Sequence, residues 1–224
     1  MSSQVPATAP ARRDGDSPLS PLITRHAPID RVFHWITALA VLLLMASAFL
    51  PIVGFKFSWV PLHWITGLVL TAAVLFHLVR ASFFQRLRCI LIRVRDFGDA
   101  SAGRRAAKYT LAQKLMHAAM GTVVLVVTVT GVIMLAKVDT PLWKRDPYLL
   151  EASTWGVVYV LHGAAALLIL MLTMIHIYFS LLPEKRAYLR AMIGGQMTRD
   201  EAAQFHDPNR WSGQRKDDPR ENHE

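Results

Sequence analysis

The sequence predicts an all-α membrane protein built as a bundle of four transmembrane helices. Of its 224 residues, 53% are hydrophobic, and many of these gather in four windows that contain no Lys, Arg, Asp or Glu. A helix of about 20 apolar residues crosses the roughly 30 Å hydrocarbon core of a bilayer, so each window is long enough to span it. The windows are residues 36–55, 61–79, 115–136 and 152–183.

The membrane domain is expected to cover residues 24–183. The preceding residues 1–23 are polar and rich in Pro, Ser and Ala, a composition typical of a disordered tail. Pro51 ends the first helix, and Gly54 and Pro61 bracket a short turn before the second.

The polar segments outside the windows predict two further helical elements. Residues 86–114 are expected to hold a short interfacial helix and then a break at Gly103. Residues 184–224 are expected to form a cytoplasmic C-terminal helix and tail, with the helix over 187–204 interrupted at Gly194-Gly195.

The formal net charge of +9 is concentrated in one loop, which favours membrane orientation over nucleic-acid binding. Basic loops next to membrane spans remain in the cytoplasm near anionic lipid headgroups, so this loop and both termini are predicted to be cytoplasmic. The basic residues between the second and third windows are Arg80, Arg86, Arg88, Arg93, Arg95, Arg104, Arg105, Lys108 and Lys114.

The single cysteine, Cys89, excludes several kinds of site. One cysteine cannot form an internal disulfide, a cysteine-ligated zinc site or an iron–sulfur cluster held by this chain alone. Any iron bound by this chain must therefore be held by histidine.

Two histidine pairs with the same spacing point to haem. His63 and His77 lie fourteen residues apart in the second window, as do His162 and His176 in the fourth. In a helix this spacing is about 21 Å along the axis, on nearly one face. Ionisable side chains inside a span mark functional sites by default, and neutral imidazole is a good iron ligand. The pairs predict two stacked b haems, each held by two histidines, which carry electrons.

The depth of each histidine sorts the candidate ligands. His63 and His162 both lie near the outer side and form one natural pair. His176 lies near the cytoplasm with three candidate partners: His34, His77 and His117. A faint repeat, in which Arg31 precedes His34 and Lys114 precedes His117 by the same interval, suggests two halves related by a pseudo-two-fold axis along the membrane normal.

Several segments carry a resemblance to a known family. The chain resembles the membrane cytochrome b (gamma) subunit of respiratory formate dehydrogenase, within the di-haem cytochrome b family that also serves Ni–Fe hydrogenases. The similarity covers about residues 24–211. The matching segments are residues 29–35, 62–67, 108–114, 130–133 and 192–211, with His162 and His176.

The resemblance implies a function for the whole chain. It implies that an iron–sulfur (beta) subunit passes electrons from a molybdenum- or tungsten-containing catalytic (alpha) subunit through the two b haems to quinone on the cytoplasmic side. The chain would not itself oxidise the substrate. Its location would be the bacterial cytoplasmic (inner) membrane, in contact with lipid.

The resemblance also implies roles for particular residues. His63 and His162 would ligate the outer haem, and His34 and His176 the inner haem. Gln113, at the start of the third span, would line a quinone site near His176. The family's usual Asn and Gly in that segment are Thr110 and Ala112 here, so the Thr110 hydroxyl would bond the quinone carbonyl.

Alternatives remain open at this point. Symmetry favours His77 over His34 as the second ligand of the inner haem; otherwise His77 would contact the haem propionates or a backbone carbonyl. Other functions are a stand-alone di-haem cytochrome b acting as a quinol oxidoreductase, a hydrogenase cytochrome b subunit, or a non-redox scaffold whose histidines only pack.

Overall fold

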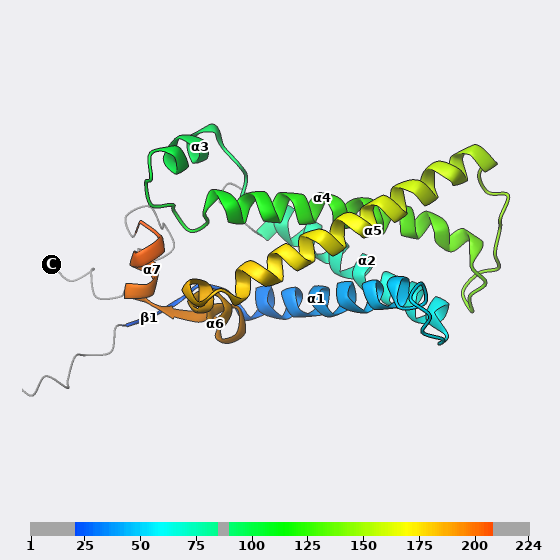
Figure 1. Cartoon of the computed structure of the whole chain (residues 1–224), viewed down its shortest axis with the longest axis horizontal. Helices are drawn as coiled ribbons and strands as arrows, with labels where there is room; N and C mark the ends of the chain where they lie inside the picture. Colours follow the sequence, from blue (N-terminus) through cyan, green and yellow to red (C-terminus); the bar gives the residue numbers. More distant parts are fainter. Residues whose placement is uncertain (1–20, 85–89, 208–224) are drawn as a thin grey trace, which may run out of the picture.

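Four long helices run along the long axis of the molecule (Figure 1). The computed structural model describes residues 21–84 and 90–207. All four helices are long and apolar enough to cross a membrane, which confirms the predicted all-α bundle. They are α1 (Pro28–Phe49), α2 (Trp59–Phe84), α4 (Leu111–Met134, continued by the 3-10 turn η2, Leu135–Lys137) and α5 (Ala152–Leu181).

The first two helices extend beyond the uncharged windows. Pro28 at the helix start and Asp30 in the first turn favour an earlier beginning of α1. Arg80, near the end of α2, forms an ion pair with Asp30. This pair explains why charged residues are tolerated at these helix ends.

The helices pack as two antiparallel pairs. α1 packs along α2 and α4 along α5, and the two pairs meet mainly where α2 approaches α4. A buried apolar layer fills the middle of the bundle. It consists of Ala40, Val41, Leu70 and Ile169, with Leu44, Met45, Val74, Met120, Val123 and Val124 packed against it.

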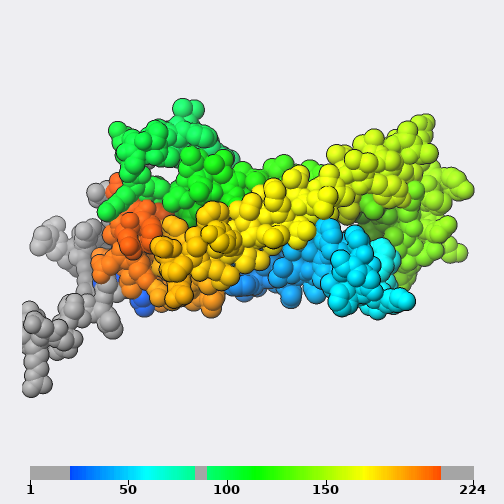
Figure 2. Space-filling view, viewed as in Figure 1, coloured from blue at the N-terminus to red at the C-terminus, as the bar shows by residue number. Residues whose placement is uncertain are grey.

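The outer faces of the helices are apolar and uncovered. In the most apolar window of each helix, only 6% of residues are buried within the chain in α4 and 17% in the others. Lipid is the solvent that such faces require, because a water-exposed surface of this extent would aggregate. In the space-filling view the uncovered helices form one elongated body (Figure 2).

The segment before α4 contains the predicted short helix. α3 spans Val94–Ser101, and the chain turns at Gly103 with a positive φ of 64°, as expected. Lys114 of α4 is buried and binds Asp96 of α3 at 2.8 Å, which ties the two helices together. Cys89 lies outside the described residues.

The two ends of the described chain meet at one end of the bundle, which we call the cap end (Figure 1). The opposite end, with the α1–α2 turn and the α4–α5 loop, is the loop end. The group of short elements that covers the cap end is called the end cap. It consists of β1 (Leu22–Thr24), η3 (Pro183–Lys185), α6 (Arg186–Gly194), β2 (Gln196–Thr198) and α7 (Arg199–Phe205).

A two-stranded sheet in the end cap corrects two sequence-based boundaries. β1 pairs antiparallel with β2, with Ile23 opposite Met197, so Leu22 and Ile23 are ordered rather than part of the predicted tail. The predicted helix over 187–204 is interrupted at Gly195 (φ 87°) as expected, but a strand follows the break. Neither strand shows a local pattern, because each forms only through its distant partner.

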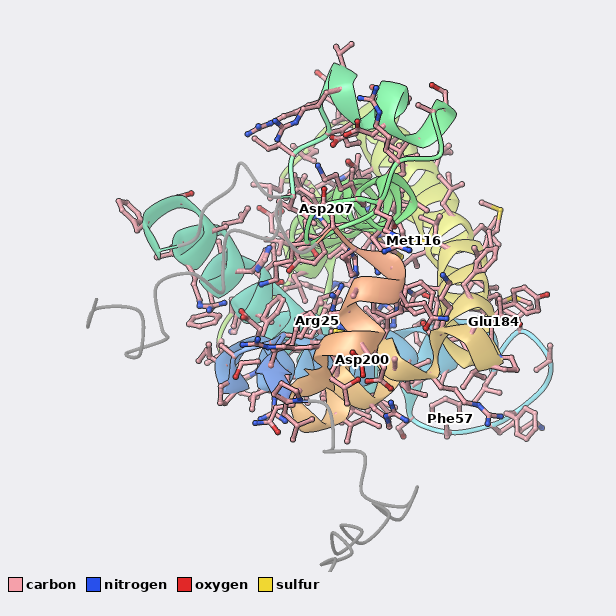
Figure 3. All side chains as sticks on the ribbon, turned by 90° about the vertical axis from the view of Figure 1, so that its left-hand side faces the viewer. Arg25, Phe57, Met116, Glu184, Asp200 and Asp207 are labelled. Carbon is pink, nitrogen blue, oxygen red and sulfur yellow. The ribbon has the colours of Figure 1, made fainter. Side chains whose placement is uncertain are left out.

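Arg25 and His206 form the centre of the end cap. Arg25 is buried, donates to the Lys108 carbonyl at 3.2 Å, and lies 3.2 Å from Nε2 of His206. Its guanidinium covers the Tyr188 ring at 4.7 Å, and burial lowers its pKa. Viewed end-on, Arg25 lies beside α7 (Figure 3). The cap thus joins three segments that are distant in sequence.

Candidate functional site

Two histidines face each other between α2 and α5, toward the loop end. The ring centres of His63 and His162, which we call the loop-end pair, lie 6.3 Å apart. An imidazole nitrogen binds a metal ion at about 2.0 Å and the ring centre lies about 1 Å further away, so two imidazoles on opposite sides of one ion have centres about 6 Å apart. The observed spacing fits two axial ligands of one iron.

A hydroxyl group fixes the tautomer of His63. Ser47 is fully buried in α1, donates its hydroxyl proton to the Leu44 carbonyl at 3.0 Å, and lies 2.8 Å from Nδ1 of His63. Since the hydroxyl proton is already donated, its oxygen accepts from Nδ1–H. Nε2 of His63 is then the unprotonated nitrogen and can bind a metal ion.

The same arrangement recurs at His162. The hydroxyl of Thr130 in α4 donates to the Val126 carbonyl at 2.7 Å and lies 2.9 Å from Nδ1 of His162. Gly131 gives the ring its room, since a Cβ there would lie 3.2 Å from Cε1 of His162. The sequence analysis did not predict that Ser47 contacts a histidine, and it included Thr130 only as part of a matching segment. The signal that could have indicated both contacts is a hydroxyl residue within an apolar span.

A second pair lies between α1 and α5, toward the cap end. The ring centres of His34 and His176, the cap-end pair, are 6.3 Å apart with the ring planes at 59°. The structure therefore places His34 opposite His176, where the sequence left His34 and His77 as alternatives. Their assignment as ligands remains a prediction.

The apolar middle layer separates the two levels. Leu70 is halfway between His63 and His77 on α2, and Ile169 is halfway between His162 and His176 on α5. Both side chains are buried, at 2% and 4% exposure. The bundle thus holds paired imidazoles at two depths with hydrocarbon between them.

His77 and His117 form a third pair, between α2 and α4. Their ring centres are 6.2 Å apart, with the ring planes again at 59°. The Phe33 ring stacks on His77 at 4.8 Å between centres and 13° between planes. His77 therefore lies opposite His117 and not opposite His176.

The two predicted quinone-site residues begin α4. Thr110 is the N-cap: its hydroxyl accepts from the Gln113 backbone N–H at 3.2 Å, and the Gln113 side-chain oxygen accepts from the Thr110 N–H at 3.0 Å. This reciprocal capping box stabilises the helix start. It engages one oxygen of each side chain, and the role of both residues in quinone binding stays a prediction.

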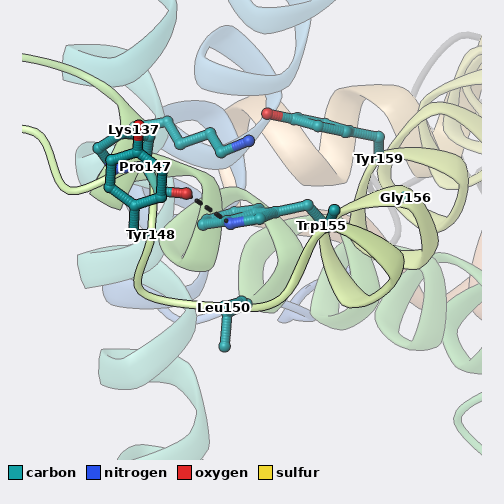
Figure 4. Close-up of a pocket in the computed structure, with 8 residues that line it drawn as sticks. Lys137, Pro147, Tyr148, Leu150, Trp155, Gly156 and Tyr159 are labelled. Carbon is teal, nitrogen blue, oxygen red and sulfur yellow. Dashed lines mark hydrogen bonds between the residues drawn. The ribbon is translucent and has the colours of Figure 1, made fainter.

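A hollow of about 370 Å³ lies at the loop end, in the first turns of α5 (Figure 4). The Lys137 ammonium lies 4.3 Å from the centre of the Trp155 ring and 5.1 Å from that of Tyr159. Trp155 donates its indole N–H to the Pro147 carbonyl at 3.0 Å. Aromatic and lysine side chains of this kind are typical of a membrane–water interface.

The kind of metal site follows from the number of ligands. Among the described residues, no group of three or more His, Cys, Asp or Glu could hold a metal ion. Two imidazoles are too few for a structural zinc site, but they complete the coordination of an iron whose other ligands come from a haem macrocycle. Four apolar spans with facing imidazoles define a membrane haem b electron-transfer protein.

Comparison with known families agrees with this class. The family model of the prokaryotic cytochrome b561 family matches residues 25–195, which include every histidine of the three pairs. The chain belongs to the prokaryotic cytochrome b561 family. No curated protein matches the chain.

Proposed function

We propose that this chain is the membrane subunit of a respiratory dehydrogenase, with formate dehydrogenase as the favoured enzyme. It would carry electrons from the iron–sulfur subunit to quinone. The observation that carries the proposal is the presence of the loop-end and cap-end pairs at two depths. Each has its ring centres 6.3 Å apart. The resemblance of the 108–114 and 192–211 segments favours the formate dehydrogenase branch.

Each pair would hold one haem b through iron. A haem with histidine on both faces exchanges single electrons and offers no open position to oxygen or substrate. The chain's own residues position the ligands: Ser47 and Thr130 hold the rings of the loop-end pair by Nδ1, and the middle layer keeps water out between the two levels.

The loop end supports the docking of a partner subunit. Its turn and loop carry large apolar side chains that the chain itself leaves uncovered, although neither belongs to a membrane-spanning helix. They include Ile52, Val53, Phe55, Leu142 and Tyr148. Uncovered apolar patches mark interaction sites, and we infer that this one contacts the partner subunit because it lies next to the loop-end pair, where electrons would arrive.

The cap end supports a quinone site. α4 begins there with Thr110 and Gln113, and α5 reaches the same end with His176 (Figure 1). The Thr110 hydroxyl acts as an acceptor in the capping box, so its proton remains available for a quinone carbonyl. We assign the cap end to the cytoplasmic face because the basic loop lies there.

The test is purification of the tagged chain from its native membrane. We expect an iron–sulfur subunit and a molybdenum or tungsten subunit to co-purify, and formate to reduce the haem. Reduction by quinol alone, with no co-purifying subunit, would replace the proposal with a stand-alone quinol oxidoreductase. A reduced-minus-oxidised spectrum without a b haem signal would exclude both electron-transfer functions and leave the non-redox scaffold as the remaining alternative.

A further inference from the structure

Residues 105–109, which we call the entry segment, lead into α4 and lie against the end cap. Three consecutive carbonyls of this segment each accept a hydrogen bond from a different group of the cap. The Ala106 carbonyl accepts from the Asp207 N–H at 2.8 Å, the Ala107 carbonyl from Nδ1 of His206 at 2.5 Å, and the Lys108 carbonyl from Nη2 of Arg25 at 3.2 Å. In the end-on view Asp207 lies at the end of α7 (Figure 3). The backbone before α4 is thus held residue by residue by groups distant in sequence.

His206 has the tautomer that its bond to the entry segment requires. The Ala107 carbonyl can only accept, so Nδ1 of His206 carries the proton. Nε2 then accepts from Nη1 of Arg25 at 3.2 Å and from the Tyr188 hydroxyl at 3.0 Å. The side chain is fully buried, and both ring nitrogens are paired. His206 therefore joins the entry segment to α6 and to Arg25.

The end cap is itself fixed to the helices that carry the cap-end pair. α6 follows α5 with only the turn η3 between them. Near the end of α6, the Ile193 carbonyl accepts from Nη1 of Arg31 at 2.5 Å, and the Met192 carbonyl accepts from the Trp35 indole N–H at 3.4 Å. Arg31 and Trp35 lie on α1 on either side of His34 in the sequence. The cap that holds the start of α4 is therefore tied to α1 and α5.

The held carbonyls lie next to the residues predicted to bind quinone. Thr110 follows Lys108 by two residues and is the N-cap of α4. The capping box joins Gln113 to Thr110, so both side chains follow the position of the entry segment. A displacement of about 1 Å can cost a reaction about 100-fold, and a functional side chain keeps its place only when the groups behind it are held.

We propose that Arg25 and His206 are positioning residues of the quinone site. Through the entry segment they set where Thr110 and Gln113 meet the quinone ring. This inference rests on the proposed function, because it takes Thr110 and Gln113 as the quinone site. It gives the end cap, which lies outside the path between the two histidine levels, the task of shaping the substrate site.

The experiment measures the oxidation of reduced haem by quinone in the purified full-length protein. The haem is reduced with dithionite, freed of excess reductant, and mixed anaerobically in a stopped-flow instrument with a short-chain benzoquinone or naphthoquinone, so no partner subunit is needed. His206→Leu removes the donor to the Ala107 carbonyl. We expect the half-saturating quinone concentration to rise about tenfold, less than the loss of about 100-fold for a full 1 Å displacement. Haem content and the limiting rate should stay at the wild-type values.

A conservative variant distinguishes positioning from a loss of packing. In His206→Asn the side-chain amide keeps a donor for the Ala107 carbonyl. Its half-saturating quinone concentration should therefore lie near the wild-type value, well below that of His206→Leu. Equal values in the two variants would overturn the inference, because the bond to the entry segment would then not matter.

Two exposed arginines of the cap end provide a matched pair of variants. Arg105→Ala removes the bond from the entry segment to the Ala203 carbonyl of α7 at 2.8 Å. Arg190→Ala removes the ion pair with Glu201 that joins α6 to α7 and does not involve the entry segment. Only Arg105→Ala should raise the half-saturating quinone concentration. Equal effects of the two variants would show a general loosening of the end cap and overturn the inference.

The outcomes separate this inference from the proposed function. If Gln113→Glu weakens quinone binding while His206→Leu does not, the inference is overturned and the proposed function stands. If quinone does not oxidise the haem of the wild type, both are overturned. Should His206→Leu lose haem, Arg105→Ala decides the question, and an unchanged half-saturating concentration in that variant overturns the inference.

Discussion

Oγ of Ser47 lies 2.8 Å from Nδ1 of His63, and its own proton goes to the Leu44 carbonyl. An Nδ1–H···O bond of this kind raises the basicity of the ligating nitrogen and thereby stabilises ferric over ferrous iron. Within the described residues, neither His34 nor His176 has a hydroxyl partner at Nδ1. A haem held by the loop-end pair, as proposed, is therefore expected to have a lower potential than one held by the cap-end pair, which would favour electron transfer toward the cap end.

Removing either hydroxyl should raise the potential of the haem that we propose for the loop-end pair. In Ser47→Ala and Thr130→Val, Nδ1–H of the ligand loses its hydroxyl acceptor, and loss of such partners weakens metal binding by about 10- to 100-fold. A redox titration should show one b component shifted upward, together with faster loss of haem from that site.

Thr128→Val is the matched control for Thr130→Val. Thr128 lies on the same helix, and its hydroxyl has no hydrogen-bond partner among the described residues. Its substitution should leave both midpoint potentials unchanged. Equal shifts in the two variants would show that the effect comes from packing of α4 and not from the bond to His162.

Gln113→Glu separates quinone binding from helix capping. Glutamate at this position keeps the capping box with Thr110 but removes the amide donor. We expect unchanged thermal stability and a raised KM for quinone. Gln113→Ala should raise KM as well and also cost about 0.3–1.5 kcal/mol of stability through the lost cap.

The haem signals serve as the internal control for both Gln113 variants. Each should still accept electrons from the partner subunit, because neither change touches a paired histidine. A Gln113→Glu protein with wild-type kinetics at limiting quinone would remove Gln113 from the quinone site and leave it as a cap alone.

The end cap should loosen as the pH falls. Burial, followed by the nearby Arg25 guanidinium, lowers the pKa of His206 from 6.5 to about 4. The unfolded segment therefore binds more protons between those values, so stability is complete above about pH 6.5 and decreases by up to about 3 kcal/mol as the pH falls to about 4. Hydrogen exchange of residues 196–206 should accelerate over that range, after correction for the intrinsic rate.

His206→Asn isolates this effect. Asparagine does not titrate and keeps a donor for the Ala107 carbonyl, which Nδ1 of His206 now approaches at 2.5 Å. The pH dependence should shrink but not vanish, because the pKa of His26 is also lowered to about 4 by burial and then by Arg25. If the variant kept the full pH dependence, His206 would not be the titrating group.

The orientation of the bundle can be read from the single cysteine. Cys89 lies in the basic loop between α2 and α4, which we place in the cytoplasm. A membrane-impermeant thiol reagent should leave Cys89 unlabelled in intact spheroplasts and label it in inverted vesicles. Cys89→Ser is the control without a reactive thiol. Labelling of Cys89 in intact spheroplasts would place the loop on the outer side and reverse the proposed direction of electron transfer.

The sequence by itself determined the four spans and the depth of each histidine. An apolar run of some twenty residues without charge spans a bilayer as a helix, because each backbone group then bonds within its own segment. The existence of four spans therefore needed no tertiary information, although α1 runs over Pro28–Phe49 and leaves the end of window 36–55 in the following turn. The fourteen-residue spacing likewise fixed two levels on α2 and on α5. The break at Gly195 followed from local backbone preference.

Only the tertiary structure decided which histidine faces which. Helical periodicity fixes the face on which a side chain lies, but the neighbour of that face depends on how the helices pack. His34 therefore meets His176, and His77 meets His117. For the same reason the sequence did not predict the contact of Ser47 with His63 or the β1–β2 sheet. Each joins groups that come close together only after the chain has folded.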